Sequence, residues 1–505
     1  MSKEAQLQRE LIKFLADKLG YKEVLSQDIA YNGLIIKEDL HTILTTGRNK
    51  YNFDELAKSY FNSDAEKTLD AICDEIIVQL YGREYEYKTN TAIFLQQEVW
   101  RFKGFEFKLF FPQGSPGNNC DFDKNIFSVA EELVYQPKIS YVEADYNRRP
   151  DLVVHVNGLI FSLIELKHVS QNSTANDGVT KIIANYHEIV SKFGIGSSVG
   201  KSDNEVKERN AVLSLYERVV HVVSADDRSL YISRNIESLR AACLKADNAS
   251  SYIENEFKNI FQPYPAKTNE SADSEMSNLY NYFVDIYSKT AIENEILYYN
   301  YREKSSGHQS LITPRPKQKF GADRTVEHVN YLYANEDNPN FIEQEFRRKL
   351  EKHKVKKDVI EVEVKKRLSL VNNSNFFSIL KQYAAGFGKT KLMSWEAVQF
   401  INMRTVDKSD YLFDKVILVS DRLDLREQMS QTFDAMPLLG PSSWMQVNDQ
   451  SDFKEGLSSS SCRILVVNIH KFKKLNENLN KKHKKQLAAM RVAFIIDEVH
   501  RSNDG

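Results

Sequence analysis

The chain has 505 residues, of which 42% are hydrophobic and 27% charged, and its formal net charge is −2. This composition is that of a globular protein, and a length beyond the limit of one hydrophobic core predicts roughly three domains. The small net charge excludes nucleic-acid binding through overall positive charge, and the absence of any apolar run of about 18 residues excludes a membrane-spanning helix. Four scattered cysteines without a Cys-x-x-Cys pair predict reduced thiols of a cytoplasmic protein.

The N-terminal part predicts helices followed by strands. Residues 4–19 carry apolar side chains at helical spacing, and Gly20 is placed to end that helix. Further helices are expected within residues 50–80. Residues 91–111 are rich in aromatic and β-branched side chains and predict strands, as do parts of residues 126–143.

A hairpin is predicted next, with strands over Leu152–Val156 and Leu159–Leu166. Asn-Gly lies between the strands, and this dipeptide is the strongest short signal for a two-residue turn. Along the second strand Glu165 and Lys167 share one face, because side chains alternate. Asp151 begins the first strand, so two carboxylates and a lysine are expected to meet at one end of the hairpin.

These three side chains suit metal-assisted hydrolysis of a phosphodiester. Mg²⁺ prefers carboxylate and carbonyl oxygens and keeps several waters, so Asp151 and Glu165 are its expected ligands. The Lys167 ammonium would hold a water or an anionic transition state beside them. The alternative is a surface hairpin whose charges are solvated or form a weak ion pair, since so short a motif also arises by chance.

The middle of the chain predicts an α/β unit and then helices. A helix over 179–193 and a strand over 219–223 complete a unit with a mixed sheet that ends near residue 240. Residues 245–310 predict a connecting helical region. Charged side chains dominate residues 334–372, and we favour a solvated helix over a DNA-contacting patch because acidic residues dilute the basic ones.

A glycine-rich loop carries the second chemical motif. Residues 376–382 predict a buried strand, the loop Gly386-Phe387-Gly388-Lys389-Thr390 follows, and residues 391–401 predict a helix. Glycines let backbone amides approach phosphates, and the helix N-terminus adds positive potential. Lys389 is expected to reach the β- and γ-phosphates of ATP, and Thr390 to ligate Mg²⁺. Tyr383 stands where the full signature has a glycine.

Three apolar strands follow the loop, over 416–420, 464–467 and 492–496, and the last ends in Asp497-Glu498. Asp497 would hold Mg²⁺ through water and Glu498 would polarise the attacking water; an acidic surface turn is the alternative. Strands that alternate with helices predict a parallel, doubly wound sheet with nucleotide at its carboxyl edge.

Two further segments allow two interpretations each. Gln318 follows a Pro-Arg-Pro-Lys segment and would contact the adenine edge, or the segment is a proline-rich linker. The basic cluster between Lys471 and Lys485 would face DNA phosphates, although a solvated helix is favoured.

Taken together, these motifs resemble the restriction (motor) subunit of type I restriction–modification enzymes, over essentially the whole chain. The resemblance is carried by a PD-(D/E)xK nuclease triad, helicase motifs of superfamily 2 and a glutamine motif. These match, respectively, Asp151, Glu165 and Lys167; Gly386–Thr390, Val419–Leu425, Val467–Phe472 and Asp497–Ser502; and Arg315-Pro316-x-Gln318.

The resemblance implies three regions in an α/β chain. A metal-dependent DNA endonuclease domain would span residues 1–240, a helical connector 241–304, and the first RecA-like lobe of an ATP-driven translocase 305–505. Implied cofactors are Mg²⁺ and ATP. Implied partners are double-stranded DNA and the modification (methyltransferase) and specificity subunits, with no membrane.

Two departures from the family pattern occur. The family carries Gln-x-x-x-Tyr on the helix after the triad, whereas here Tyr186 is present and Ile182 stands in the place of the glutamine. The second RecA-like lobe is absent from these 505 residues, so we expect weak ATP binding and little hydrolysis. The alternatives are a stand-alone nuclease with a vestigial ATPase lobe and a non-catalytic DNA-binding or assembly module.

Overall fold

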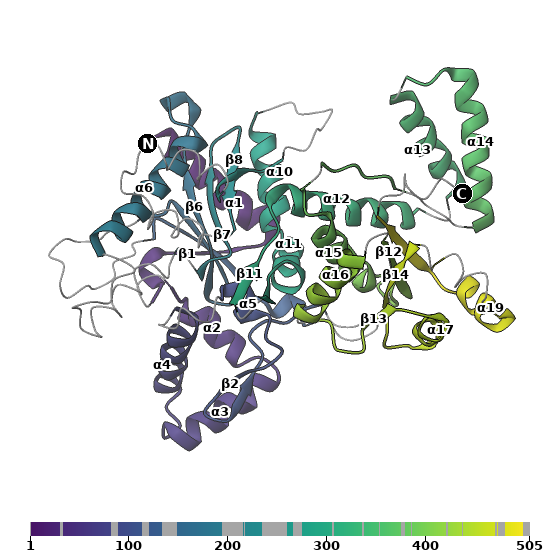
Figure 1. Ribbon diagram of the computed structural model, residues 1–505. Coiled ribbons are helices and arrows are strands. Elements are labelled where there is room, and N and C mark those ends of the chain that lie inside the picture. Colours follow the sequence, from purple (N-terminus) through teal and green to yellow (C-terminus); the bar gives the residue numbers. More distant parts are fainter. Residues whose placement is uncertain are drawn as a thin grey trace. The chain divides into compact units, whose positions relative to one another are not determined.

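The chain forms two compact α/β units (Figure 1). Unit 1 comprises residues 1–114 and 119–317, and unit 2 comprises 115–118 and 318–505. No helix among the described residues is long and apolar enough to cross a bilayer. The computed structural model describes residues 2–30, 34–81, 89–113, 121–133, 149–193, 216, 218–234, 260–265, 275–305, 308–335, 338–352, 354–374, 379–384, 386–420, 423–436, 438–469, 472 and 480–497.

Unit 1 is built on a mixed sheet of seven strands. In spatial order they are β1 (Lys22–Val24), β4 (Phe127–Glu131), β5 (Leu152–Val156), β6 (Leu159–Leu166), β7 (His221–Ala225), β8 (Leu230–Ser233) and β9 (Gln262–Pro263). The β1–β4 and β6–β7 pairs are parallel and the others antiparallel. Every residue of β5 and β6 is buried, because both faces of the sheet are covered. The predicted hairpin is confirmed, and it lies in the core, not on the surface.

The hairpin turn adopts the geometry that its sequence demands. Asn157 and Gly158 both have positive φ, 53° and 82°, as a type I′ turn requires. The β5–β6 register shifts by one residue between Val154 and His155, where Phe161 has no partner of its own. This is a β-bulge, and it increases the local twist of the hairpin.

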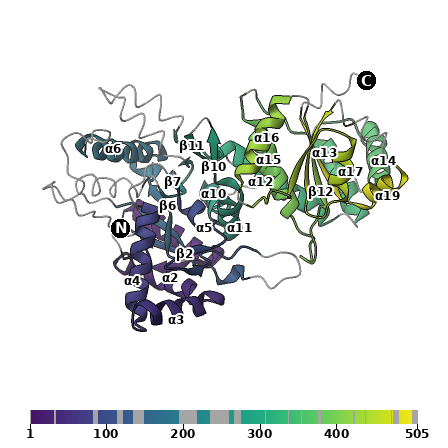
Figure 2. The same ribbon diagram turned by 60° about the horizontal axis from the view of Figure 1, so that its bottom comes forward.

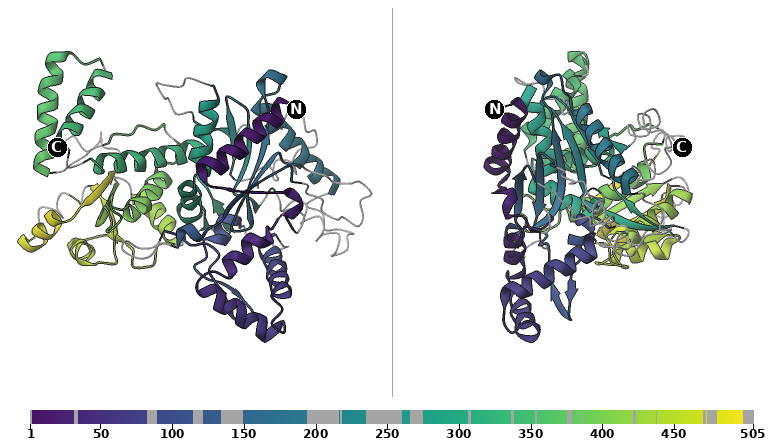
Figure 3. Two further views of the ribbon diagram at one scale, coloured as in Figure 1. Left: turned by 180° about the vertical axis from the view of Figure 1, so that it is seen from behind. Right: turned by 90° about the vertical axis from the view of Figure 1, so that its left-hand side faces the viewer.

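Helices cover both faces of this sheet. Figure 3 shows α1 on one face and α6 on the other. The α1 helix follows the prediction and ends at Gly20, whose φ of 71° is the left-handed conformation of a helix cap. The α- and π-helices in the described part of unit 1 are α1 (Lys3–Leu19), α2 (Lys37–Leu44), α3 (Arg48–Tyr60), α4 (Ala65–Ile76), η3 (Ile77–Tyr81), α5 (Thr91–Leu95), α6 (Ala175–Phe193), α10 (Glu275–Tyr287), α11 (Lys289–Asn294) and η6 (Glu295–Tyr299).

Two local predictions in unit 1 were wrong because side-chain caps outweigh residue preference. The start of the strand predicted over 91–111 is helix α5, which Asn90 caps by accepting a 3.0 Å hydrogen bond from the amide of Ile93. The remainder forms the short hairpin of β2 (Trp100–Phe102) and β3 (Phe105–Phe107). The α6 helix begins at Ala175, earlier than predicted, where Asp177 accepts hydrogen bonds from the amide and hydroxyl of Thr174.

The segment predicted as a connector packs into unit 1. Tyr280 of α10 stacks on Phe14 of α1 with ring centroids 4.5 Å apart. The backbone carbonyl of Tyr287 accepts a 2.7 Å hydrogen bond from the hydroxyl of Tyr21. The segment continues into an unpredicted hairpin of β10 (Tyr301–Ser305) and β11 (His308–Ile312). Residues 275–312 are therefore part of the fold of unit 1.

Unit 2 contains a parallel sheet in the order β13 (Trp444–Val447), β14 (Ile464–Asn468), β12 (Lys415–Ser420) and β15 (Val492–Ile496). This confirms the three predicted strands and their parallel arrangement. Figure 2 shows α15 and α16 on one side of the sheet and α17 and α19 on the other. Among its described residues, unit 2 has the helices α12 (Pro316–Tyr333), α13 (Pro339–Lys352), α14 (Lys357–Ser374), α15 (Lys389–Asn402), α16 (Leu423–Ala435), α17 (Gln450–Ser458) and α19 (Lys481–Ala489).

The buried strand predicted before the glycine-rich loop is wrong in its described part. Residues 379–382 have no regular structure, and Leu380 is 87% exposed. Side chains anchor this segment to α15 and to the loop instead, since Lys381 binds Glu396 of α15 and Tyr383 stacks on Phe387 of the loop at 4.5 Å.

The charged residues 334–372 form an antiparallel pair of helices, α13 and α14. Leu350, Ile360 and Val364 make a small core between them. Arg347 binds Glu343 on its own helix and Glu361 on the other. The pair is a mostly solvated element of mixed charge, as the favoured interpretation expected.

Candidate functional site

The two carboxylates of the predicted triad meet at the end of the β5–β6 hairpin. Leu152 pairs with Ile164, and the register carried one residue further places Asp151 opposite Glu165. The Leu166 amide donates a 2.6 Å hydrogen bond to Oδ2 of Asp151. On the other side, Gln8 of α1 donates a 2.7 Å hydrogen bond to the Asp151 carbonyl. Asp151 is thus held by both the sheet and the first helix.

Lys167 completes the triad at the same edge of the sheet. Its Nζ donates 2.7 Å hydrogen bonds to Oε1 of Glu165 and to the carbonyl of Leu166, and lies 3.9 Å from Oε1 of Glu4. Burial alone would lower the pKa of Lys167, but the hydrogen bond and charge of Glu165 outweigh burial and raise it. Lys167 is therefore a fixed ammonium group beside the two carboxylates.

The electrostatics of the pair favour binding of a cation. Burial and then the negative charge of Glu165 raise the pKa of Asp151 to about 6. A carboxyl group whose pKa is raised by a neighbouring carboxylate would be stabilised in its charged form by a positive ion between them.

The donor set also fits a hard divalent cation. Mg²⁺ in proteins is held by one or two carboxylates and keeps several waters. Asp151 and Glu165 supply the carboxylates, and Glu165 has a buried side chain. The described residues contain no cluster of three or more His, Cys, Asp or Glu side chains suited to a metal.

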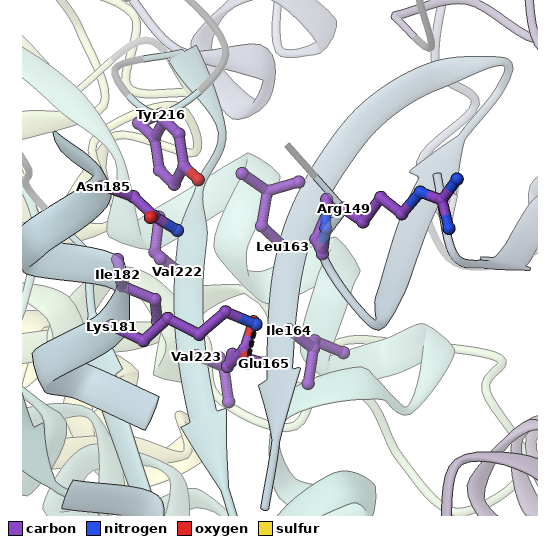
Figure 4. Close-up of a pocket in the computed structure, with 11 residues that line it drawn as sticks. Arg149, Leu163, Ile164, Glu165, Lys181, Ile182, Asn185, Tyr216, Val222 and Val223 are labelled. Atoms are coloured by element: carbon purple, nitrogen blue, oxygen red, sulfur yellow. Dashed lines mark hydrogen bonds and ion pairs between the residues drawn. The ribbon is translucent and has the colours of Figure 1, made fainter. Parts of the chain in front are cut away.

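A second lysine, which sequence analysis did not predict, contacts the same carboxylate. Lys181 of α6 forms an ion pair with Oε1 of Glu165, the oxygen that Lys167 also binds. Figure 4 shows Lys181 reaching from the helix towards Glu165. Both residues line a pocket of about 310 Å³, whose wall also includes Ile182, Asn185 and Tyr216.

The position of Lys181 depends on a close approach between α6 and the sheet. A Cβ atom on Gly178 would lie 2.1 Å from Oγ of Ser224 and 3.3 Å from Cγ of Glu165. Only glycine fits there without displacing the strand residue. Residues three apart share a helix face, so this contact brings Lys181 over Glu165.

In unit 2, the glycine-rich loop leads directly into α15. Gly386 and Gly388 have φ of 75° and 84°, which favour glycine, and the helix begins at Lys389. Gln318 of α12 donates a 2.6 Å hydrogen bond to the Phe387 carbonyl. The structure thus brings the predicted glutamine to the loop, and Lys389 and Thr390 occupy the first turn of the helix.

The predicted acidic pair follows β15. Asp497 is buried, and its amide donates a 2.9 Å hydrogen bond to the carbonyl of Val419 on β12. Asp497 therefore lies at the carboxyl end of the parallel sheet, where the sequence predicted nucleotide. Glu498 lies outside the described residues.

Comparison with known proteins shows that two parts of the chain, residues 1–198 and 382–505, are similar to known protein families. Residues 1–198 match the family model of the type I restriction enzyme R protein N terminus. Residues 382–505 match the model of the SWI2/SNF2 ATPase.

One named relative, from Mycoplasma pneumoniae (strain ATCC 29342 / M129 / Subtype 1), is the C-terminal part of a protein called "Putative type I restriction enzyme MpnIIP endonuclease subunit". It is 32% identical over 125 residues, which cover 24% of this chain and 56% of that protein. The chain thus matches little more than half of the length of this relative.

Within residues 1–198, some residues around the triad had no sequence signal strong enough to predict them. Gln8 and Lys181 reach the site only through tertiary packing. The one available signal was Gly178 near the start of an amphipathic helix, since a helical glycine often marks close packing. Ile182 lines the pocket, and the side chain of Tyr186 lies outside the described residues.

Proposed function

We propose that this chain acts as the restriction subunit of a type I restriction–modification complex. Unit 1 would be a Mg²⁺-dependent DNA endonuclease of the PD-(D/E)xK kind. Unit 2 would contain the first RecA-like lobe of an ATP-driven translocase of double-stranded DNA. The supporting observation is the pair of half-buried Asp151 and buried Glu165 with Lys167 beside it, in a region that matches R protein N termini.

In the nuclease site, each side chain has a separate role. Asp151 and Glu165 would hold Mg²⁺, which when bound polarises the scissile phosphate and lowers the pKa of its water. Lys167 is fixed by Glu165 and the Leu166 carbonyl, so its ammonium would orient the attacking water or stabilise the pentavalent phosphorane.

In the ATPase lobe, the loop and the end of the sheet would hold the nucleotide. The α15 N-terminus, Lys389 and Thr390 would bind the phosphates and their Mg²⁺. Asp497 would bind the same ion through water, and Glu498 would polarise the attacking water. Gln318 already contacts the loop and would reach the adenine edge.

The partners follow from the same proposal. An R protein acts in a complex with modification and specificity subunits, and its substrate is double-stranded DNA. Because the specificity subunit would choose the recognition sequence, unit 1 needs only contacts to the DNA backbone and the scissile phosphate. Co-purification with modification and specificity subunits from the same source would distinguish this function from that of a stand-alone nuclease.

The nuclease half is tested by Lys167→Ala in a plasmid-nicking assay with Mg²⁺. Cutting should be lost while cooperative thermal unfolding persists, because Lys181 still pairs with the buried Glu165 in the variant. Lys58→Ala, an exposed lysine on α3, is the matched control and should cut normally. Unchanged cutting by Lys167→Ala would refute the triad.

The ATPase half is tested by Lys389→Ala in an equilibrium binding assay with a fluorescent ATP analogue. Binding should be lost, because the lysine supplies the main positive charge to the phosphates. Lys357→Ala on α14 is the control and should bind as the wild type does. If the wild type shows no affinity for nucleotide, the motor assignment fails for this chain.

A further inference from the structure

Glu165 accepts from two lysines through a single oxygen, and the two lysines are held differently. Lys167 also binds the Leu166 carbonyl, and its side chain is 13% exposed. The side chain of Lys181 is 47% exposed, and among the described residues its ammonium group donates a hydrogen bond to Glu165. Of the two ammonium groups, that of Lys181 is therefore the easier to displace.

A divalent cation would compete directly with Lys181. Without a metal ion, the charges of Asp151 and Glu165 are balanced by those of the two lysines. A cation bound to both carboxylates would offset part of the negative charge of Glu165. The attraction between Glu165 and the ammonium groups of Lys167 and Lys181 would therefore weaken. Lys167 would stay in place through its bond to the Leu166 carbonyl, whereas Lys181 has no comparable second bond among the described contacts.

The pocket beside Glu165 has room for the Lys181 side chain once it has left this carboxylate. It extends from Glu165 along α6, with Asn185 one further turn along the helix and Tyr216 nearby (Figure 4). A nucleic-acid strand placed with its scissile phosphate at the carboxylate pair would run through or beside this space. An ammonium that moves away from Glu165 would therefore meet a neighbouring phosphate of the same strand.

We propose that Lys181 is a DNA-contacting residue that occupies Glu165 in the metal-free site and moves to a backbone phosphate when a divalent cation binds Glu165. This inference rests on the proposed nuclease function and adds a residue outside the triad. It predicts opposite effects on two ligands: removing the lysine strengthens metal binding and weakens DNA binding.

The test compares Lys181→Met with the wild type in two binding experiments. In titration calorimetry with Mg²⁺ and no DNA, the variant should bind the metal about two- to fivefold more tightly, the scale of one partly exposed ion pair. In DNA binding with Ca²⁺ replacing Mg²⁺ to slow cutting, affinity should fall. The slope of log affinity against log salt concentration should decrease in magnitude by about one, as for one lost phosphate contact.

Two further variants separate this role from a structural one. Lys181→Arg keeps the charge and should keep the salt slope of the wild type, and Lys58→Met, which removes a more exposed lysine on α3, should change neither measurement. A Mg²⁺ affinity of Lys181→Met that is equal to or weaker than that of the wild type, or an unchanged salt slope, overturns the inference. If instead the wild type binds no Mg²⁺, or Lys167→Ala still cuts, the proposed nuclease function itself has failed.

Discussion

The amide of Leu166 donates a hydrogen bond of 2.6 Å to Oδ2 of Asp151, so the first carboxylate is tied to the strand that carries the second. An asparagine at position 151 could still accept this bond through its carbonyl oxygen but would carry no charge. Asp151→Asn should therefore fold normally and lose Mg²⁺ binding, with nicking reduced by about 100-fold or more. Asp123→Asn, an exposed acid in the same unit, is the control for calorimetry and plasmid nicking. Nicking within about threefold of the wild type would contradict the assignment.

Gly178→Ala should destabilise unit 1, although alanine is the better helix former by about 1 kcal/mol. The new Cβ would lie 2.1 Å from Oγ of Ser224, which itself donates a 2.7 Å hydrogen bond to the Ala175 carbonyl. Overpacking of this kind costs about 1–3 kcal/mol. Thermal unfolding should show the loss, and adding Ser224→Ala should recover part of it by removing the clashing oxygen. A Gly178→Ala protein more stable than the wild type would show that α6 does not approach the sheet so closely.

Gln318→Ala should weaken nucleotide binding through the loop. The side chain donates a 2.6 Å hydrogen bond to the Phe387 carbonyl, between the two loop glycines. Loss of one such bond costs about 1 kcal/mol, so the affinity for a fluorescent ATP analogue should fall roughly fivefold. Lys317→Ala, an exposed neighbour, should bind like the wild type. Equal affinity of all three proteins would remove the glutamine from the nucleotide site.

Lys381→Met should destabilise unit 2 in a pH-dependent manner. Burial raises the pKa of Glu396 above its ordinary 4.5, against the opposing effect of Lys381, and loss of the lysine would raise it further. Breaking a buried ion pair costs about 3 kcal/mol. The pKa of Glu396 is higher in the folded protein than in the unfolded one. The full cost therefore applies at a pH above the folded pKa, where Glu396 is charged, and it disappears as the pH falls towards 4.5 and Glu396 becomes protonated.

Thermal unfolding over this pH range measures the effect, with Glu396→Gln as the comparison. The glutamine variant removes the charge that needs a partner, so its loss of stability should be smaller and should not depend on the titration of Glu396. A Lys381→Met protein whose loss of stability stays constant with pH would contradict the pairing.

A fragment of residues 1–240 should not fold as a stable unit, whereas residues 1–317 should. Cutting at 240 removes Tyr280 from its stacking partner Phe14, and Tyr287 from a 2.8 Å hydrogen bond with Ser162 on β6. Burial of Tyr287 alone contributes about 2 kcal/mol or more, since its side chain is fully buried. Circular dichroism during heating measures this, with the longer fragment as the control. Equal cooperative transitions for both fragments would restore the boundary near 240.

The sequence predicted those parts of the fold whose signals are local. The limits of β5, β6 and β15 follow from apolar runs bounded by an Asn-Gly turn or an acidic pair, and the structure confirms them. The prediction failed at α5 because a single cap at Asn90 determined the helix. It also failed for residues 379–382, where Lys381 binds Glu396 on the helix after the loop and Tyr383 stacks on Phe387 of the loop, contacts that strand periodicity does not reveal.

The residues of the candidate site likewise fall into two groups, those that local sequence signals predict and those that only tertiary packing brings together. Asp151, Glu165 and Lys167 belong to one hairpin, so strand periodicity and the turn were enough to place them together. Gln8 and Lys181 come from α1 and α6, and their approach depends on tertiary packing that periodicity does not describe. Family resemblance did not supply Lys181 either, because the pattern it offered concerned the neighbouring position, Ile182.

The bulge at Val154 and His155 determines which residue of β6 lies opposite Asp151, and therefore whether the two carboxylates face the same side of the sheet. An uninterrupted ladder counted from the turn would pair Asp151 with Ile164 and direct Glu165 to the opposite side of the sheet. The unpaired Phe161 absorbs that difference. A hairpin one residue shorter and free of the bulge would bring the same two acids together. Proteins that share this arrangement can therefore differ in the number of residues between their acids, and a search with one fixed spacing would overlook some of them.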